Sequence, residues 1–249
     1  MKIDFEKNIG LFELDSNLTL RLKPLLNYFQ EVVGIHSDTR GCGLKWLMDQ
    51  GKAWVLHRIG IHIHRLPGFG DELKISTWYR GGNGFRAYRD FEILSKGEKI
   101  VSANSLWLFI DLNRKKILQV PEEADNWYTV EKDKALDLDI DTWRPNLNFE
   151  PETVKTIGLR PSDYDPLGHV NNALYFDFLE NLTSLAFDDK RRVQQVVMQF
   201  NKEILKGMDT VKIGMRKTED HYEYKLFSHE GIHAAGNFLL FPEQDSLGV

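Results

Sequence analysis

The sequence passes from a polar loop into a helix along the stretch Arg160-Pro-Ser-Asp-Tyr-Asp-Pro-Leu-Gly-His-Val-Asn-Asn-Ala-Leu-Tyr175. Apolar residues recur at helical spacing over 173–187 and predict an amphipathic helix there. Asn171 or Asn172 stands where a side chain caps the first turn of such a helix. Alternating patterns then predict strands over residues 193–204, 210–217, 222–228 and 233–241.

The same order of elements occurs once before in the chain. Helical spacing runs from Leu22 to Val33, and strand-like runs follow at 53–66, 73–79, 86–94 and 100–110. The loop Asp15–Thr19 precedes the earlier helix as the loop Asp165–His169 precedes the later one. The sequence therefore predicts a tandem duplication of one α+β unit, a helix followed by an antiparallel sheet.

Three segments follow from this repeat. We expect a first unit at residues 1–120, an acidic inter-unit linker at 121–151 and a second unit at 152–249. The linker lacks sustained periodicity but contains large aromatic residues, among them Trp127 and Trp143. We therefore expect it to pack across a sheet surface rather than to form a disordered tether.

The composition excludes several classes of protein. A net charge of −5 over 249 residues is not that of a globally basic nucleic-acid binder. The one cysteine, Cys42, excludes an intramolecular disulfide framework. No apolar run approaches the ~18 residues of a membrane span. The first residues resemble neither a signal peptide nor a transit peptide, so we expect a soluble, cytoplasmic protein of bacterial type.

Common catalytic motifs are missing from the sequence, including the Gly-x-Ser-x-Gly elbow and the phosphate-binding glycine loops. Cys42 lies in a Gly-Cys-Gly turn, where a structural role is expected rather than a nucleophilic one. His62 and His64 share a strand face at a spacing that can bind a metal. Because no third ligand is evident, two solvated histidines are the simpler interpretation. No metal and no organic cofactor is predicted.

Asp165 and His169 lie four residues apart, immediately before the predicted later helix. A helix N-terminus offers unpaired N–H groups and the positive end of the helix dipole, which can hold a carbonyl oxygen as negative charge develops on it. A histidine at that place can supply a proton, and a carboxylate can orient it or act on water. The residues alone leave two interpretations open: an acyl-transfer site, or a turn in which Asp165 and Asn171 only fix the backbone.

The motif from Asp165 to Glu180, Asp-x-x-x-His-Val-Asn-Asn-x-x-Tyr-x-x-x-x-Glu, resembles the signature of hotdog thioesterases. Further features resemble the acyl-ACP thioesterases of plants and bacteria, namely Leu25–Glu31 with His36, Trp54–Arg58, Arg65–Pro67, Gly70-Asp71, Thr77-Trp78, Arg89–Phe91, Ser105–Trp107 and Asp111–Arg114. The resemblance implies a tandem (double) hotdog fold, in which each sheet wraps its own helix and the two sheets join into one continuous sheet. It also implies an enzyme of fatty acid biosynthesis, which hydrolyses the thioester between a fatty acyl chain and acyl carrier protein (ACP).

The resemblance also assigns residues. Asp165 and His169 match the family's catalytic Asp and His, and Phe200–Ile204 matches the strand segment that carries the family's catalytic glutamate, here Glu203. Ile204 replaces the cysteine of plant members, so a cysteine-based triad is impossible. Leu167 replaces an asparagine that many members carry, and Asn171, Asn172 or Asn201 can substitute for it in binding substrate. In this family the second unit carries the catalytic groups and the first shapes the acyl cavity.

The repeat predicts one active site per chain. Asp15 is the counterpart of Asp165, but His169 corresponds to Thr19 and Glu203 to Arg65, so the first unit lacks the imidazole and the second carboxylate. We expect Glu203 to activate water, His169 to orient or protonate, and helix N–H groups to stabilise the oxyanion. Direct attack by Asp165, giving an anhydride, stays open.

Three alternatives remain at this point: an acyl-CoA thioesterase, a non-catalytic acyl-thioester-binding protein and a dehydratase of the same fold. The dehydratase is disfavoured because its usual His-Phe-Pro segment is absent. The implied partner is ACP, an acidic protein that a basic run such as Lys190-Arg-Arg192 can attract. A homodimer and the preferred chain length stay open.

Overall fold

The computed structural model describes residues 1–165, 168–187 and 191–242. The chain divides into two compact units, Met1–Trp143 and Arg144–Val249, and each is described by itself. In the described part of the chain, no helix is both long enough and apolar enough to cross a membrane.

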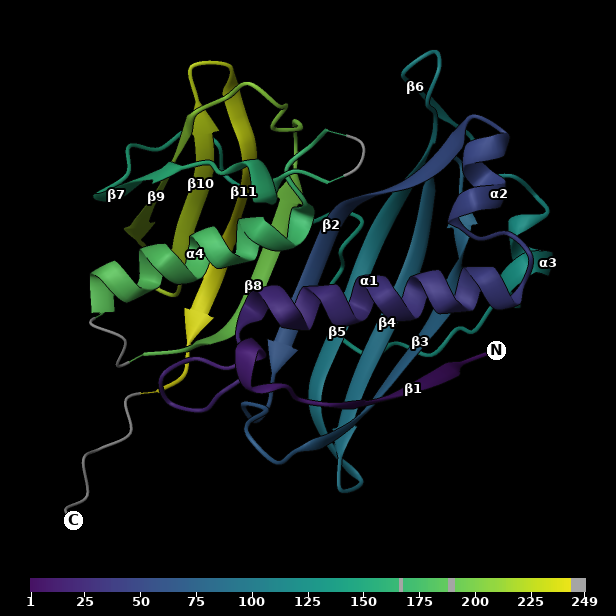
Figure 1. Ribbon diagram of the computed structural model, residues 1–249, viewed down its shortest axis with the longest axis horizontal. Coiled ribbons are helices and arrows are strands. Elements are labelled where there is room, and N and C mark those ends of the chain that lie inside the picture. The colour runs from purple at the N-terminus through teal and green to yellow at the C-terminus, as the bar shows by residue number, and fades with distance from the viewer. Residues whose placement is uncertain (166–167, 188–190, 243–249) are drawn as a thin grey trace. The chain divides into compact units, whose positions relative to one another are not determined.

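The first unit is an antiparallel sheet crossed on one face by a long helix (Figure 1). The sheet order is β1-β3-β4-β5-β2, and the short β6 pairs with β5. The elements in chain order are β1 (Ile3–Asn8), the 3₁₀ turn η1 (Leu11–Glu13), α1 (Leu22–Thr39), α2 (Leu44–Asp49), β2 (Lys52–Ile63), β3 (Glu72–Asn83), β4 (Arg86–Ser95), β5 (Glu98–Asp111), β6 (Lys116–Leu118) and α3 (Ala124–Tyr128).

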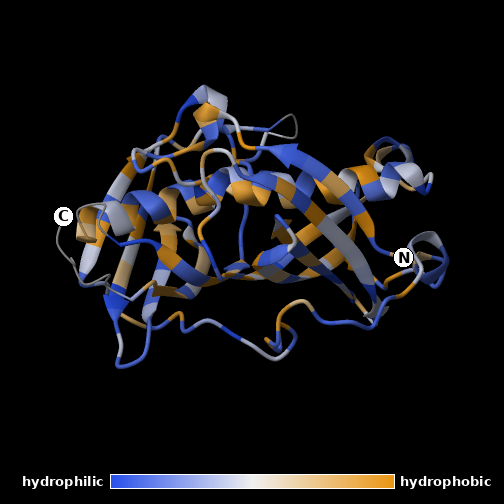
Figure 2. Ribbon diagram, turned by 90° about the horizontal axis from the view of Figure 1, so that it is seen from below, coloured by the Kyte–Doolittle hydropathy of each residue, from blue (hydrophilic) through white to orange (hydrophobic). Residues whose placement is uncertain are grey.

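The apolar stripe of α1 packs against the sheet because residues at helical spacing share one face. Leu25, Leu26, Phe29 and Val32 on that stripe are all buried, and the Phe29 ring lies 4.5 Å from that of Phe91 on β4. Burying each such side chain contributes roughly 1.5–3 kcal/mol. Hydrophobic and hydrophilic residues alternate along the strands and helices, as a two-sided packing requires (Figure 2).

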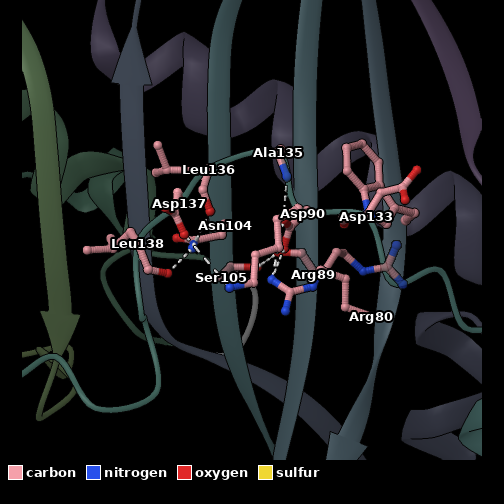
Figure 3. A network of polar contacts seen from close by, with 12 residues as sticks. Arg80, Arg89, Asp90, Asn104, Ser105, Asp133, Ala135, Leu136, Asp137 and Leu138 are labelled. Carbon is pink, nitrogen blue, oxygen red and sulfur yellow. Dashed lines mark hydrogen bonds and ion pairs between the residues drawn. The ribbon is translucent and has the colours of Figure 1, made fainter.

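The outer face of this sheet is covered by the segment that follows α3. The Ala135 N–H donates to the Asp90 carboxylate at 2.8 Å, and the Asn104 side-chain amide donates to the Leu138 carbonyl at 2.7 Å (Figure 3). The Trp78 indole N–H likewise donates to the Asp133 carbonyl at 2.8 Å. The packing predicted for the linker is therefore confirmed over 133–138.

The second unit repeats the design with fewer elements: β7 (Thr153–Gly158), the 3₁₀ turn η2 (Pro161–Asp163), α4 (Asn172–Phe187), β8 (Val193–Phe200), β9 (Thr210–Lys217), β10 (Tyr222–Ser228) and β11 (Gly231–Leu240). Its sheet order is β8-β11-β10-β9-β7, with antiparallel pairs. Helix α4 buries Phe176, Leu179 and Leu182. The two-unit helix-plus-sheet fold predicted from the repeat, a double hotdog, is confirmed. The joining of the two sheets stays a prediction.

The repeat extends to the hydrogen bonds of the two 3₁₀ turns. In η1 the Gly10 N–H donates to Glu13, and in η2 the Arg160 N–H donates to Asp163, and both carboxylates are buried. Strands β1 and β7, which precede these turns, were not predicted from the sequence. Each is a six-residue edge strand whose residues alternate between half-buried and exposed, so its hydrophobic signal is weak.

Candidate active site

The loop that leads into α4 is held by hydrogen bonds between its own ends. The Asp165 N–H donates to the His169 carbonyl at 2.8 Å, and the His169 N–H donates back to the Asp165 carboxylate at 3.1 Å. Gly168 between them has a φ of 81°, a left-handed conformation that glycine adopts without strain. Asp165 therefore shapes the loop that presents His169. Leu167 lies outside the described residues.

Asn171 caps α4. Its side-chain oxygen accepts the Ala173 N–H at 2.8 Å, the contact that defines an N-cap residue. Asn172 is the first helical residue. Its N–H has no acceptor among the described residues, as expected for the first amide of a helix. The binding roles predicted for Asn171 and Asn172 stay predictions, and the cap already uses the oxygen of Asn171.

Glu203 is carried by a segment that leaves the sheet. Strand β8 ends at Phe200, earlier than predicted, because the next two amides, of Asn201 and Lys202, turn to the His233 carbonyl at 2.8 and 3.2 Å. The chain then runs beside the Asp165–His169 loop, where the Val170 N–H donates to the Ile204 carbonyl at 2.9 Å. Ile204 is fully buried, which anchors the exposed Glu203 beside it.

This arrangement places the Glu203 Oε2 atom 3.3 Å from the His169 Nε2 atom. The imidazole is 31% exposed and the carboxylate 56%, so both are accessible to water and to a ligand. An imidazole N–H that points at a carboxylate is held in one orientation, and the pair can take up or deliver a proton. The structure thus brings the three predicted catalytic residues, Asp165, His169 and Glu203, into one loop cluster beside a helix N-terminus.

Two supporting residues were not assigned this role from the sequence. His233 on β11 is fully buried; its Nδ1 atom lies 3.3 Å from the Lys202 carbonyl and its Nε2 atom 2.8 Å from the Ser228 hydroxyl. Burial lowers its pKa. Tyr175 on α4 is also buried, which raises its pKa, and its ring packs against Phe200 at 5.3 Å. The motif contains Tyr175, whereas nothing in the sequence distinguishes His233 from other strand residues.

The predicted correspondence of Glu203 with Arg65 is wrong by one residue. Leu20 donates to the Pro67 carbonyl at 2.8 Å as Val170 donates to that of Ile204 at 2.9 Å, so the counterpart of Glu203 is Leu66. The bridges Thr19–Gly68 and His169–Leu205 agree with this register. The match of Asp71 with Asp209 assumed that the two loops have equal lengths. The stretch from Ile204 to Asp209 is in fact one residue longer than the stretch from Pro67 to Asp71. The first unit still has neither the imidazole nor the second carboxylate.

The other candidate residues, Cys42, His62 and His64, belong to the first unit. Cys42 is buried and burial raises its thiol pKa, which disfavours the reactive thiolate. The His64 Nε2 atom lies 2.9 Å from the Ser102 hydroxyl. Within residues 1–165, 168–187 and 191–242, no group of three or more His, Cys, Asp or Glu side chains is arranged to hold a metal ion.

The hotdog units and the paired His169 and Glu203 at a helix N-terminus define a hotdog protein with a candidate acid–base site. The sequence model described as the acyl-ACP thioesterase N-terminal domain matches residues 3–128, and that of the acyl-ACP thioesterase C-terminal domain matches residues 148–237. This chain belongs to the acyl-ACP thioesterase family.

Known relatives and solved structures agree with this. The chain is 24% identical over 226 residues to the chloroplastic palmitoyl-acyl carrier protein thioesterase of Arabidopsis thaliana, covering 83% of this chain and 53% of that protein. It thus spans about half the length of the plant relatives it matches. An acyl-ACP thioesterase from Bacteroides thetaiotaomicron has a TM-score of 0.85 at 21% identity, covering 96% of this chain and 97% of that one. The 12:0-ACP thioesterase from Umbellularia californica has a TM-score of 0.84 at 15% identity, covering 97% of each chain.

Proposed function

We propose that this chain hydrolyses fatty acyl-ACP thioesters to a free fatty acid and holo-ACP. The observation that carries the proposal is the 3.3 Å approach of His169 to Glu203 beside the N-terminus of α4, in a chain of this family. The family descriptions, and the names of plant relatives such as an acyl-[acyl-carrier-protein] hydrolase of Cuphea viscosissima, support the thioester and its carrier.

The reaction uses water as nucleophile. Glu203 takes a proton from the water while the water oxygen forms a bond to the thioester carbonyl carbon. Negative charge then moves onto the carbonyl oxygen. The Asn172 N–H at the start of α4 and the helix dipole stabilise that charge. When the carbon–sulfur bond breaks, the thiolate leaves and is protonated through the His169 and Glu203 pair. Asp165 holds the loop in position for these steps.

The alternative in which Asp165 attacks the thioester predicts an anhydride intermediate. Water then attacks the anhydride, and in a single turnover in ¹⁸O-water attack at the aspartyl carbon leaves heavy oxygen in Asp165. Label in the fatty acid with none in the protein excludes attack of water at the aspartyl carbon. Label in Asp165 establishes the covalent route and overturns the water mechanism.

The experiment that tests the function measures hydrolysis across acyl-ACP chain lengths beside the matching acyl-CoAs. Higher kcat/KM on ACP substrates supports the proposal, higher kcat/KM on the CoA series makes the protein an acyl-CoA thioesterase, and binding without turnover makes it a thioester-binding protein. Chain-length preference comes from the same data.

The carrier partner, the location in the cell and the oligomeric state are also proposals. The ACP partner follows from the substrate. A cytoplasmic location stays a prediction, since the names of the plant relatives place those proteins in the chloroplast. A homodimer also stays open.

A further inference from the structure

One end of the first unit exposes a group of large apolar side chains. Helix α2 has six residues, of which Leu47 is buried, whereas Leu44, Trp46 and Met48 are 63%, 41% and 45% exposed. Ile117 on β6 is 52% exposed. Exposed apolar side chains that gather in one place, rather than occurring singly, mark a surface that meets another apolar phase.

The turn between β5 and β6 lies directly beside α2. The Leu112 N–H donates to the carbonyl of Gly51, two residues past the end of α2, at 2.8 Å. A Cβ atom at Gly51 would lie 2.6 Å from the side-chain nitrogen of Asn113. Figure 1 shows α2 and β6 at the same end of the sheet. Residues 44–48 of α2 and 113–117 of the turn and β6 therefore form one surface, the tip patch.

The tip patch is cationic in a chain whose net charge is −5. It contains no carboxylate and four cations, namely Lys45, Arg114, Lys115 and Lys116. All four are exposed, and within the described ranges none of them makes an ion pair. The nearest carboxylates along the chain are those of Asp49 and Asp111, and the latter accepts the N–H groups of Asn113 and Arg114 at 3.0 and 2.8 Å. The patch thus combines unpaired positive charge with exposed apolar side chains.

Exposed apolar side chains also occur at the opposite end of the sheet, but without this charge. Strand β2 begins at Lys52 beside α2, and the loop past its far end contains Phe69, which is 63% exposed. The Phe69 N–H donates to the carbonyl of the exposed Leu18 at 3.0 Å. The nearest cation to Phe69 along the chain, Arg65, pairs with Asp71 at 2.9 Å. Charge therefore distinguishes the tip patch from this second group.

We propose that the tip patch binds the surface of a lipid bilayer that contains anionic phospholipids. The apolar side chains enter the boundary between headgroups and acyl chains, a position that tryptophan favours, and the four cations lie among the phosphate groups. The proposal does not rest on the proposed function. Together with that function, it places the release of a fatty acid beside a phase that takes it up.

Two other partners fit the tip patch less well. A second copy of this chain, docked by the same face, brings the same cations together, and like charges across an interface oppose association. An acidic protein matches the charge, but a stable protein interface also needs a closely packed, complementary core. A bilayer adapts its shape to single apolar side chains that project from a short helix and a hairpin turn, so it needs no such match.

The test is sedimentation of the full chain with vesicles of two compositions. One is phosphatidylcholine alone, and the other contains about one third phosphatidylglycerol, which makes its surface negative. We expect binding to the anionic vesicles to be at least about tenfold tighter than to the neutral ones, and to weaken as salt is added. Equal binding to both compositions, or no binding to the anionic vesicles, overturns the proposal.

Lys115→Glu tests the cations and has a closely matched control in Lys96→Glu. The two lysines are exposed in the hairpin turns at opposite ends of β5, and both have a left-handed backbone, with φ of 51° and 52°. The two variants therefore make the same change in net charge from the same backbone conformation. Lys115→Glu should weaken binding to anionic vesicles roughly tenfold, and Lys96→Glu less than about twofold. Equal weakening means that net charge alone governs binding, and overturns the patch.

Leu44→Ser tests the apolar side chains, and Phe69→Ser is its control because both residues are 63% exposed. Leu44→Ser should weaken vesicle binding severalfold, and Phe69→Ser should leave it unchanged. Circular dichroism checks that both variants are folded. Weakening by Phe69→Ser with none by Leu44→Ser moves the contact to the opposite end of the sheet and overturns the assignment.

Two further measurements separate the tip patch from the active site and from a protein partner. Glu203→Gln should bind the vesicles as the wild type does, and vesicle binding stands even if no acyl-ACP is hydrolysed. Purified acyl carrier protein then replaces the vesicles, and Lys115→Glu should not change its binding. If the carrier binds, Lys115→Glu abolishes that binding and the vesicles do not bind, the patch is a protein-docking surface and the proposal is overturned.

Discussion

At the scale of single residues, the proposed acid–base chemistry rests on His169 and Glu203, which are 3.3 Å apart and both accessible to solvent. Their residue types and their place in a motif made them predictable from the sequence. Their contact was not, because it depends on β8 ending at Phe200 and on the chain returning beside the Asp165–His169 loop. His233 could not have been predicted at all, since its contacts are with backbone and with another strand.

Glu203→Gln and His169→Ala should each lower kcat by roughly 10²–10⁴, as expected when a general acid or base is removed. Both side chains are partly exposed, so the free energy of unfolding should change little. Steady-state kinetics and urea unfolding measure the two effects. Glu230→Gln is the control, because this nearby carboxylate pairs with Lys202 rather than with the histidine. A variant that keeps more than half of the wild-type turnover contradicts the role assigned to its residue.

His36 should make the first unit sensitive to acid. Burial, together with the nearby charges of Arg89 and Arg40, lowers its pKa to about 3 in the folded protein from 6.5. The unfolded chain therefore binds the proton first as pH falls, and stability is lost below about pH 6.5. Between pH 7.5 and pH 5 this costs on the order of 2 kcal/mol of the free energy of unfolding.

His36→Gln removes that titration while keeping an acceptor for Arg89. Urea unfolding at the two pH values should show a pH dependence smaller by about the same amount. Asp90, whose pKa is raised by burial to about 6, titrates in the opposite sense and is present in both proteins, so it cancels in the comparison. An identical pH dependence in the two proteins rules out this origin of the acid sensitivity.

At the scale of elements, the two long helices and most strands could be predicted, because apolar residues follow a period of 3.6 or 2 along them. The edge strands β1 and β7 could not, since half-buried edges carry a weak pattern. Helix α1 extends to Thr39, beyond the predicted end near Val33, and its last turns bury His36 rather than another apolar residue. The missed elements are those whose burial depends on partners distant in sequence.

The loops before α1 and α4 have a positive φ at corresponding positions but carry different residues there. Leu18 has a φ of 58° where Gly168 has a φ of 81°, and only glycine adopts this region without strain. Leu18→Gly should therefore raise the free energy of unfolding by about 0.5–1 kcal/mol, and Gly168→Ala should lower it by about 1 kcal/mol. Urea unfolding of both variants measures the changes. Equal effects of the same sign contradict the shared conformation.

His233 should act as a positioning residue for the segment that carries Glu203. His233→Leu removes the contacts to the Lys202 carbonyl and to Ser228, so kcat should fall about tenfold while KM changes less than threefold. Ser228→Ala keeps the Lys202 contact and should lower kcat less. The values of kcat and KM are compared only for variants that circular dichroism shows to be folded. A KM increase with unchanged kcat assigns His233 to binding instead.

At the scale of the whole molecule, the net charge of −5 opposes association with the proposed acidic carrier, so docking to it would require a local surplus of cations. Several basic residues of the second unit already have partners. Arg191 donates to the Phe241 carbonyl at 3.2 Å, Lys202 pairs with Glu230 at 2.8 Å, and Arg216 pairs with Glu223 at 2.7 Å. Lys190 lies outside the described residues. Lys206, Lys212 and Lys217 are exposed, and their ammonium groups make no ion pair with a carboxylate in the described ranges, although the Lys217 backbone N–H donates to Glu152.

Among these, Lys206 is the best candidate for guiding the carrier, because it follows Glu203 by three residues and its N–H donates to the Gly168 carbonyl at 3.0 Å. Lys206→Glu should raise KM for acyl-ACP about three- to tenfold, with little effect on a short acyl-pantetheine that needs no carrier contact. Lys45→Glu makes the same change in net charge from an exposed position on α2 and should leave both substrates unaffected.

Salt separates the local effect from the global one. The Debye length is about 8 Å at physiological ionic strength, so added salt should weaken the wild-type preference for acyl-ACP and bring it toward that of Lys206→Glu. Steady-state kinetics on both substrates at two salt concentrations measures this. If Lys206→Glu lowers activity equally on acyl-ACP and on the short acyl-pantetheine, Lys206 belongs to the active site itself. If Lys45→Glu and Lys206→Glu have equal effects, net charge rather than a docking position governs the encounter.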